Sequence, residues 1–111
     1  MDWHIAAFAS AFIVMDIASG FIQAIANKEL DSSKMRAGLW HKCGFALTII
    51  LAALIEWAMQ FIDLGFTLPL FTPVCVFIIL TEVVSIFENA CKLSPELANS
   101  KLAQLFNVEV K

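Results

Sequence analysis

Three carboxylates, each within a long apolar stretch, are the residues of this chain best placed to do chemistry. Asp16, Glu56 and Glu82 lie in the apolar stretches Ile5–Ala26, Cys43–Ile62 and Pro73–Phe87. A carboxylate at the centre of a bilayer costs about 2.5–3.5 kcal/mol, so such groups pair, face water or relay protons. One in every stretch indicates that these helices do not sit alone in lipid.

Polar neighbours extend each carboxylate into a stripe along one helix face. Residues three and four apart share a face of a helix, and lipid cannot satisfy such a stripe. The polar side chains that we predict to line or gate a pore are Asp16, Gln23, Glu56, Gln60, Glu82 and Ser85. Two other roles stay open for them: hydrogen bonds that hold helices together, at about 0.6 kcal/mol each, and a proton relay.

The composition predicts the elements that carry these stripes. Hydrophobic residues make up 60 % of the 111 residues and charged residues 15 %, whereas soluble domains have about 25 % charged residues. We predict an all-α membrane protein, a single domain over residues 1–111, with three transmembrane helices at about 5–26, 43–62 and 73–92. The net charge of −3, without a basic patch beyond the loops, argues against nucleic acid as a partner.

The distribution of lysine and arginine predicts the orientation. The expected first connection, Asn27–Lys42, and the C-terminal tail carry all seven, whereas the expected second connection, Asp63–Thr72, carries none. Cytoplasmic loops are enriched in these residues, so we expect an N-out, C-in topology with Lys42 as one of its determinants. Trp3 and Trp40, at the expected outer and inner interfaces, agree with it.

Local signals indicate two further helix starts. Thr72-Pro73 predicts the beginning of the third span, and Ser94-Pro95-Glu96 predicts a helix after it. The second of these would be a short C-terminal amphipathic tail, whose apolar face would hold Leu97, Leu102, Leu105 and Phe106. The N-terminus lacks the basic start of a secretory signal, so we expect the first span to remain in the mature chain.

Small residues are concentrated in the first span. Ten of the 22 residues from Ile5 to Ala26 are Ala, Ser or Gly, and small residues four apart allow helices to approach closely. We predict helix association through Ala7, Ala11, Gly20 and Ala24, and this span is the one expected to carry a self-association face.

Patterns typical of enzymes are absent from the sequence. There is no phosphate-binding glycine loop, nucleophile–base set or cluster of metal ligands. The three cysteines form no C-x-x-C pair, and the two histidines fall at opposite expected interfaces. We therefore predict a protein that is not an enzyme, with no catalytic residue, metal or cofactor.

The motif Glu82-x-x-Ser85-Ile86-x-Glu88-Asn89, followed by Lys92 and Pro95, is the most specific pattern in the chain. Together with Asp16, Gly20, the segment Lys28–Lys34, Gly38 and Lys42, it resembles the holins of phage lysis and toxin secretion. The family-motif residues are Glu82, Ser85, Glu88 and Asn89. The resemblance implies a homo-oligomer in the lipid bilayer of the bacterial cytoplasmic membrane. Its function would be to permeabilise this membrane, with an endolysin as a functional rather than a contact partner.

Other classes of function remain open. A small regulated ion or proton channel, or an accessory membrane subunit, could use the same carboxylates as a relay. A holin antagonist often shares the holin's sequence. For a holin, we expect the polar stripes to be hidden within single chains at low density and turned to water when helices re-pair between chains.

Overall fold

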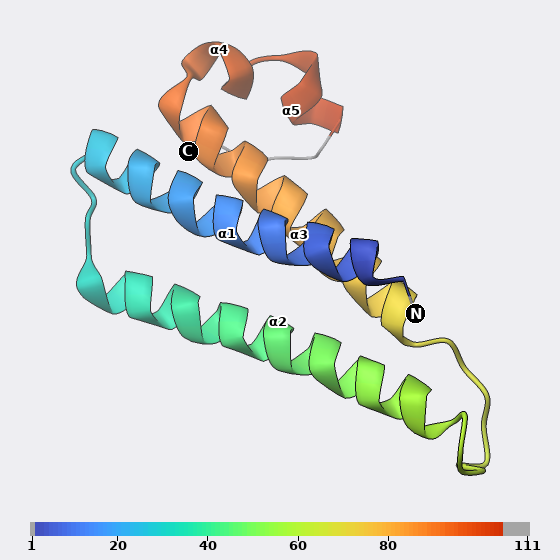
Figure 1. Ribbon diagram of the computed structural model, residues 1–111. Helices are drawn as coiled ribbons and strands as arrows, with labels where there is room; N and C mark the ends of the chain where they lie inside the picture. Colours follow the sequence, from blue (N-terminus) through green and yellow to red (C-terminus); the bar gives the residue numbers. More distant parts are fainter. Residues whose placement is uncertain (1, 106–111) are drawn as a thin grey trace.

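The computed structural model describes residues 2–105, which form three long helices and two short ones (Figure 1). The long helices are α1 (Trp3–Ala26), α2 (Ser32–Ala58) and α3 (Phe71–Leu93), and the short ones are α4 (Pro95–Ala98) and α5 (Lys101–Leu105). All three long helices are long and apolar enough to cross a membrane. The predicted all-helical fold with three candidate spans is therefore confirmed.

The bounds of α2 differ from those expected. This helix begins at Ser32 rather than Cys43, so the first connection is only residues 27–31 and Lys42 belongs to the helix. The cause is Asp31, whose carboxylate accepts hydrogen bonds from the backbone N–H groups of Ser33 and Lys34 at 2.9 and 3.4 Å. No glycine pair or proline interrupts the following turns. The expectation that Lys42 lies in a loop is wrong.

The second connection, residues 59–70, also differs from the expectation. The helix α2 ends at Ala58 rather than Ile62, and α3 begins at Phe71 with Leu70 at its N-cap rather than Thr72. The Leu70 side chain makes no capping hydrogen bond. The backbone N–H of Phe71 instead donates to Oε2 of Glu56 at 3.0 Å, so a residue distant in sequence caps this helix.

Helices α1 and α3 lie side by side and run in the same direction (Figure 1). At one end the rings of Trp3 and Phe71 are 5.7 Å apart, and at the other Asn27 Nδ2 donates to the carbonyl oxygen of Lys92 at 3.5 Å. Helix α2 runs antiparallel to both and packs less extensively against either. We call the end at residues 27–31 the first-loop end and the end at residues 59–70 the second-loop end.

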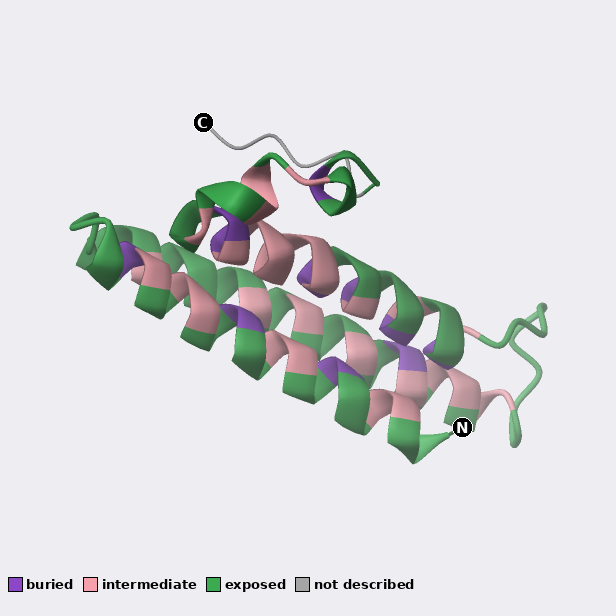
Figure 2. Ribbon diagram, turned by 90° about the horizontal axis from the view of Figure 1, so that it is seen from above, coloured by how far each residue is buried: buried purple, intermediate pink, exposed green. Residues whose placement is uncertain are grey.

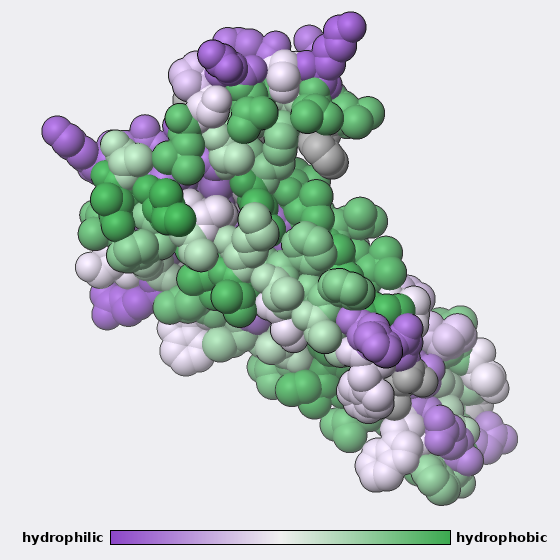
Figure 3. Space-filling model, turned by 45° about the horizontal axis from the view of Figure 1, so that its top comes forward, coloured by the Kyte–Doolittle hydropathy of each residue, from purple (hydrophilic) through white to green (hydrophobic). Residues whose placement is uncertain are grey.

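Most of the buried residues lie on α1 and α3 (Figure 2). The apolar core, toward the second-loop end, consists of Ala9, Phe71 and Cys75, with Ile5, Ala6, Ile49, Ala53 and Ile79 packed against it. Large apolar side chains remain exposed along all three long helices, and they cover much of the face seen in Figure 3. Such a surface fits a lipid environment.

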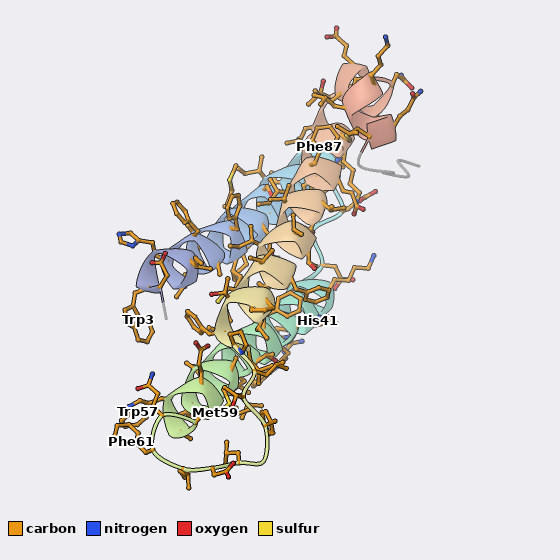
Figure 4. The ribbon with its side chains drawn as sticks, turned by 90° about the vertical axis from the view of Figure 1, so that its right-hand side faces the viewer. Trp3, His41, Trp57, Met59, Phe61 and Phe87 are labelled. Atoms are coloured by element: carbon orange, nitrogen blue, oxygen red, sulfur yellow. The ribbon has the colours of Figure 1, made fainter. Side chains whose placement is uncertain are left out.

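Aromatic side chains mark the ends of the bundle. Trp3 and Trp57 lie toward the second-loop end (Figure 4) and are 65 % and 56 % exposed. Trp40, in the first-loop half of α2, is 75 % exposed. At the start of α1, Asp2 accepts hydrogen bonds from the His4 backbone N–H and lies 3.0 Å from the His4 ring. These interactions lower the pKa of the Asp2 carboxyl.

The predicted helix start at Ser94-Pro95 is confirmed by α4, which has Ser94 at its N-cap and Pro95 as its first residue. Helix α4 packs on the end of α3, and Ala103 of α5 is buried. Leu102 and Leu105 are exposed, whereas Phe106 of the expected apolar face lies outside the described residues.

Candidate functional site

Three charged side chains, one from each long helix, meet inside the bundle. Lys42 Nζ of α2 lies 2.5 Å from Oδ2 of Asp16 in α1, and 2.8 and 2.9 Å from the two carboxylate oxygens of Glu82 in α3. The side chains of Lys42, Asp16 and Glu82 are 18 %, 7 % and 0 % exposed. We call this group the charged triad, because it is the buried polar contact that joins all three helices.

The charged triad lies at one level of the bundle. Asp16 is ten residues before the end of α1, Lys42 ten residues after the start of α2, and Glu82 eleven before the end of α3. At about 1.5 Å per residue, each is about 15 Å from the first-loop end of its helix. In a hydrocarbon core about 30 Å thick, that level is close to the middle.

The electrostatics of the charged triad follow from its composition. Two carboxylates share one ammonium group, so the net charge is −1 when all three are ionised. An isolated charge at this depth is costly, whereas opposite charges attract more strongly in a low dielectric than in water. Lys42 therefore offsets the burial of Asp16 and Glu82. Its ammonium also lies 5.4 Å from the centre of the Phe45 ring, a cation–π distance.

Asn89 extends the polar contact between α1 and α3. Its Nδ2 donates to Asp16 Oδ1 at 3.2 Å and to Ser19 Oγ at 3.0 Å. A Cβ at Gly20 would lie 3.6 Å from the same Nδ2, so this glycine packs beside the amide. Across residues 2–105, no buried side-chain nitrogen or oxygen lacks a hydrogen-bond partner. The stripes of α1 and α3 thus face one another within a single chain.

Glu56 lies apart from the other two intramembrane carboxylates. Helix α2 is antiparallel, and Glu56 is two residues before its end, so its side chain reaches the start of α3 rather than the charged triad. There it accepts the Phe71 N–H described above. From the sequence, we predict that Asp16, Glu56 and Glu82 act together. In the structure, Glu56 instead caps the start of α3 and takes no part in the charged triad.

A cavity of about 600 Å³ lies between the charged triad and the first-loop end. It is bounded by all three long helices and by the residues just before α2. Both apolar side chains, such as Phe21 and Leu39, and charged ones, such as Lys34 and Lys92, form its wall. The charged triad is the deepest charged group on this wall.

The structure distributes the other predicted residues over several environments. Gln23 and Ser85 line the cavity, and the Gln23 Oε1 accepts from Asn27 Nδ2 at 3.2 Å. Gln60 is exposed in the turn after α2, and Glu88 is half-buried in α3. Of the small residues of α1, Ala24 is buried and Gly20 adjoins Asn89, whereas Ala7 and Ala11 are exposed.

Lys42 is the member of the charged triad that the sequence did not predict as a site residue. A signal for it exists, because Met35, Lys42, Ile49 and Glu56 are seven residues apart and each is at least half-buried in α2. A repeat of seven places residues on one helix face. Extended through residues 35–42, this repeat identifies Lys42 as an inward-facing helical residue rather than a loop residue.

A charged triad within three apolar helices defines a small helical membrane protein. Among the residues described, no group of three or more His, Cys, Asp or Glu could hold a metal ion. The model of the bacteriophage holin family matches residues 2–107, and the chain belongs to this family. Holins are non-enzymatic proteins of the bacterial cytoplasmic membrane that act in phage lysis. No curated protein and no solved structure matches the chain.

Proposed function

We propose that this chain is a holin that oligomerises in the bacterial cytoplasmic membrane and permeabilises it, so that an endolysin, or a toxin, leaves the cytoplasm. The observation that carries this proposal is the family match over residues 2–107. The topology that we propose is N-out and C-in. Lys28, Lys34 and Arg36 support it, because they lie near the first-loop end and positive residues favour the cytoplasmic side.

The charged triad supports a mechanism for the change from single chains to an oligomer. Lipid tails solvate an apolar helix face as well as another apolar helix does, so polar contacts and close packing decide which helices associate. In the single chain, Lys42 holds α2 against the α1–α3 pair through two carboxylates. In a crowded membrane, Lys42 of a second copy can take the same carboxylates, and helices then re-pair between chains.

The membrane potential gives this change a trigger. Moving one elementary charge across 100 mV is worth about 2.3 kcal/mol. A helix that carries Lys42 away from its carboxylates moves charge at mid-depth, and several subunits that move together respond steeply to depolarisation. If a voltage step at fixed protein density left the permeability of the membrane unchanged, the membrane potential would not be the trigger.

The test is expression in bacteria with and without a cytoplasmic endolysin, with culture density and membrane potential followed together. We expect abrupt depolarisation in both cultures and lysis only with the endolysin. A matched control is Leu51→Ile, a conservative change at a lipid-exposed position of α2, which leaves the onset unchanged. A slow, ion-selective leak with trapped endolysin would contradict the proposal and favour a narrow channel or accessory subunit. A delay of another holin's lysis on co-expression would favour an antagonist.

A further inference from the structure

The cavity next to the charged triad occupies only one half of the bundle. Its lining in α1 begins at Asp16, in α2 it extends no further than Phe45, and in α3 it begins at Thr81. Phe45 and Thr81 lie within one helical turn of the charged triad on its second-loop side, and the other lining positions lie at its level or on the first-loop side. Polar side chains therefore border an open volume that ends near mid-depth.

The other half of the bundle is closed by apolar packing. Ala9, Phe71 and Cys75 are each 0 % exposed, and Ile49 and Ile79 pack against them. We call this group the apolar plug. An apolar constriction excludes water and stops ions without a polar barrier. Polar access from one side and an apolar closure on the other is the arrangement of a half-channel.

The volume and the wall of the cavity suit water. At about 30 Å³ for each water molecule, 600 Å³ corresponds to about 20 waters. Polar partners occur along its length, with Asn89 and Ser85 near the floor and Lys34 near the first loop. At the floor, two carboxylates face one ammonium group, so the local field favours a cation over an anion.

We propose that the cavity is an aqueous vestibule that admits water and small monovalent cations to the charged triad from the first-loop side, and that the apolar plug closes the path on the other side. The vestibule is a site of the single chain, and it rests on the proposed function only for its membrane setting. It gives the charged triad contact with one aqueous compartment, which in the proposed topology is the cytoplasm.

The test is the reactivity of single cysteines toward membrane-impermeant methanethiosulfonates, because these reagents react with the thiolate, which forms in water. The background has Cys43, Cys75 and Cys91 replaced by alanine. Ser85→Cys places a thiol in the vestibule, and Ala18→Cys is the matched control, since Ala18 is exposed on the outer surface. Both positions are eight residues from the first-loop end of their helix, at about 12 Å. Cys75, retained as the sole cysteine, reports on the apolar plug.

We expect Ser85→Cys to react at least tenfold faster than Ala18→Cys, only when reagent reaches the first-loop side, and faster with a cationic than with an anionic reagent. Cys75 should not react from either side. Equal rates at residues 18 and 85 would overturn the vestibule. Labelling of Cys75 would overturn the closure, and faster anionic labelling would overturn the preference for cations.

A second cysteine position tests the vestibule if the Ser85→Cys variant does not fold. Gly38 also lines the cavity, and a Cβ there meets no atom within 4 Å, so Gly38→Cys is sterically neutral and should label from the same side. The expression assay separates this proposal from the proposed function. Sided labelling without lysis would refute only the holin mechanism, whereas lysis with equal labelling at both test positions would refute only the vestibule.

Discussion

Replacing Lys42 by glutamine is the sharpest test of the charged triad, because it removes the only cation and leaves both carboxylates in place. The Lys42 side chain is 18 % exposed, whereas those of Asp16 and Glu82 are 7 % and 0 % exposed, so water in the cavity meets the triad chiefly at the lysine and hydrates the two carboxylates little. The variant retains a polar side chain, one bond shorter than that of lysine, that can donate two hydrogen bonds. A large effect is therefore due chiefly to the loss of the charge.

The magnitude follows from two routes open to the carboxylates. Removing one partner of a buried ion pair and leaving the other charged costs about 3–5 kcal/mol. The alternative is protonation, and neutralising a carboxyl with an ordinary pKa of about 4.3 at pH 7 costs about 3.7 kcal/mol. We expect Lys42→Gln to destabilise the closed three-helix arrangement by about 3–4 kcal/mol, which is at least a hundredfold in its equilibrium constant.

The two carboxylates should behave differently from the lysine. Glu82→Gln or Asp16→Asn leaves one carboxylate paired with one ammonium, a balanced pair, and each should cost about 1.5–3 kcal/mol, the range for a charged hydrogen bond. Replacing all three residues together removes every charge of the triad and should recover most of the stability lost in Lys42→Gln. The expected order of destabilisation is therefore set by charge balance, with the lysine first.

The assay is unfolding of the purified protein in dodecylmaltoside micelles by titration with SDS, followed by circular dichroism and tryptophan fluorescence. Lys42→Arg is the control, because it keeps the cation. A Lys42→Gln variant no less stable than Glu82→Gln would refute the charge-balance argument. In the expression assay, Lys42→Gln should depolarise the membrane earlier than the unmodified chain at equal protein density, since less free energy holds α2 in place.

Three smaller changes test the contacts around the charged triad. Glu56→Met removes the acceptor of the Phe71 N–H and should cost about 1–2 kcal/mol, with faster hydrogen exchange at that amide as its local signature; unchanged exchange would contradict the capping role. Asn89→Leu removes the amide that bonds Asp16 and Ser19 and should lower stability by about 1–2 kcal/mol in the same SDS titration, whereas no loss would show that α1 and α3 associate without it. Gly20→Ala adds a Cβ at ordinary contact distance, 3.6 Å from Asn89 Nδ2, so it should be neutral or stabilising by up to about 1 kcal/mol; a clear loss of stability would show that α1 and α3 lie closer together at this position.

The sequence predicts the number of spans because each contains a long apolar run, although α2 begins eleven residues before the expected Cys43. It also identifies the residues that the α1–α3 contact uses, since Asp16 belongs to the polar stripes, Asn89 to the family motif and Gly20 to the small residues of the first span. It does not predict that these residues meet each other. That depends on the rotation of each helix and on α1 and α3 lying side by side, which are set by packing between segments distant in sequence.

The position of Lys42 shows why the rest of the site was missed. Hydropathy excludes lysine from a predicted span, so the second span is expected to begin at Cys43. In the structure, Asp31 caps the helix, which therefore begins at Ser32. Once the turn is residues 27–31, antiparallel geometry places residues equally far from it at one level. Asp16 and Lys42 are each ten residues from it along their helices, and the ion pair then follows from a register that hydropathy cannot supply.

The two kinds of contact in this bundle have different consequences in a membrane. Helices α1 and α3 associate through close packing at Ala9, Gly20 and Ala24, together with the hydrogen bonds of Asn89. Such packing depends on the fit of two particular surfaces. Helix α2 contacts this pair through Ile49 and Ala53 beside the apolar core, and through Lys42 and Glu56, whose partners are charged or polar groups at fixed levels.

A second copy presents the same groups at the same levels. Exchange of α2 between copies therefore replaces each polar contact with an equivalent one. Lipid solvates the apolar faces of α2 equally well before and after the exchange. The packing between α1 and α3 is not replaced in this way, because α1 would have to find an α3 of another copy with the same complementary surface. We therefore expect α2 to be the helix that changes partners on assembly, while α1 and α3 remain together.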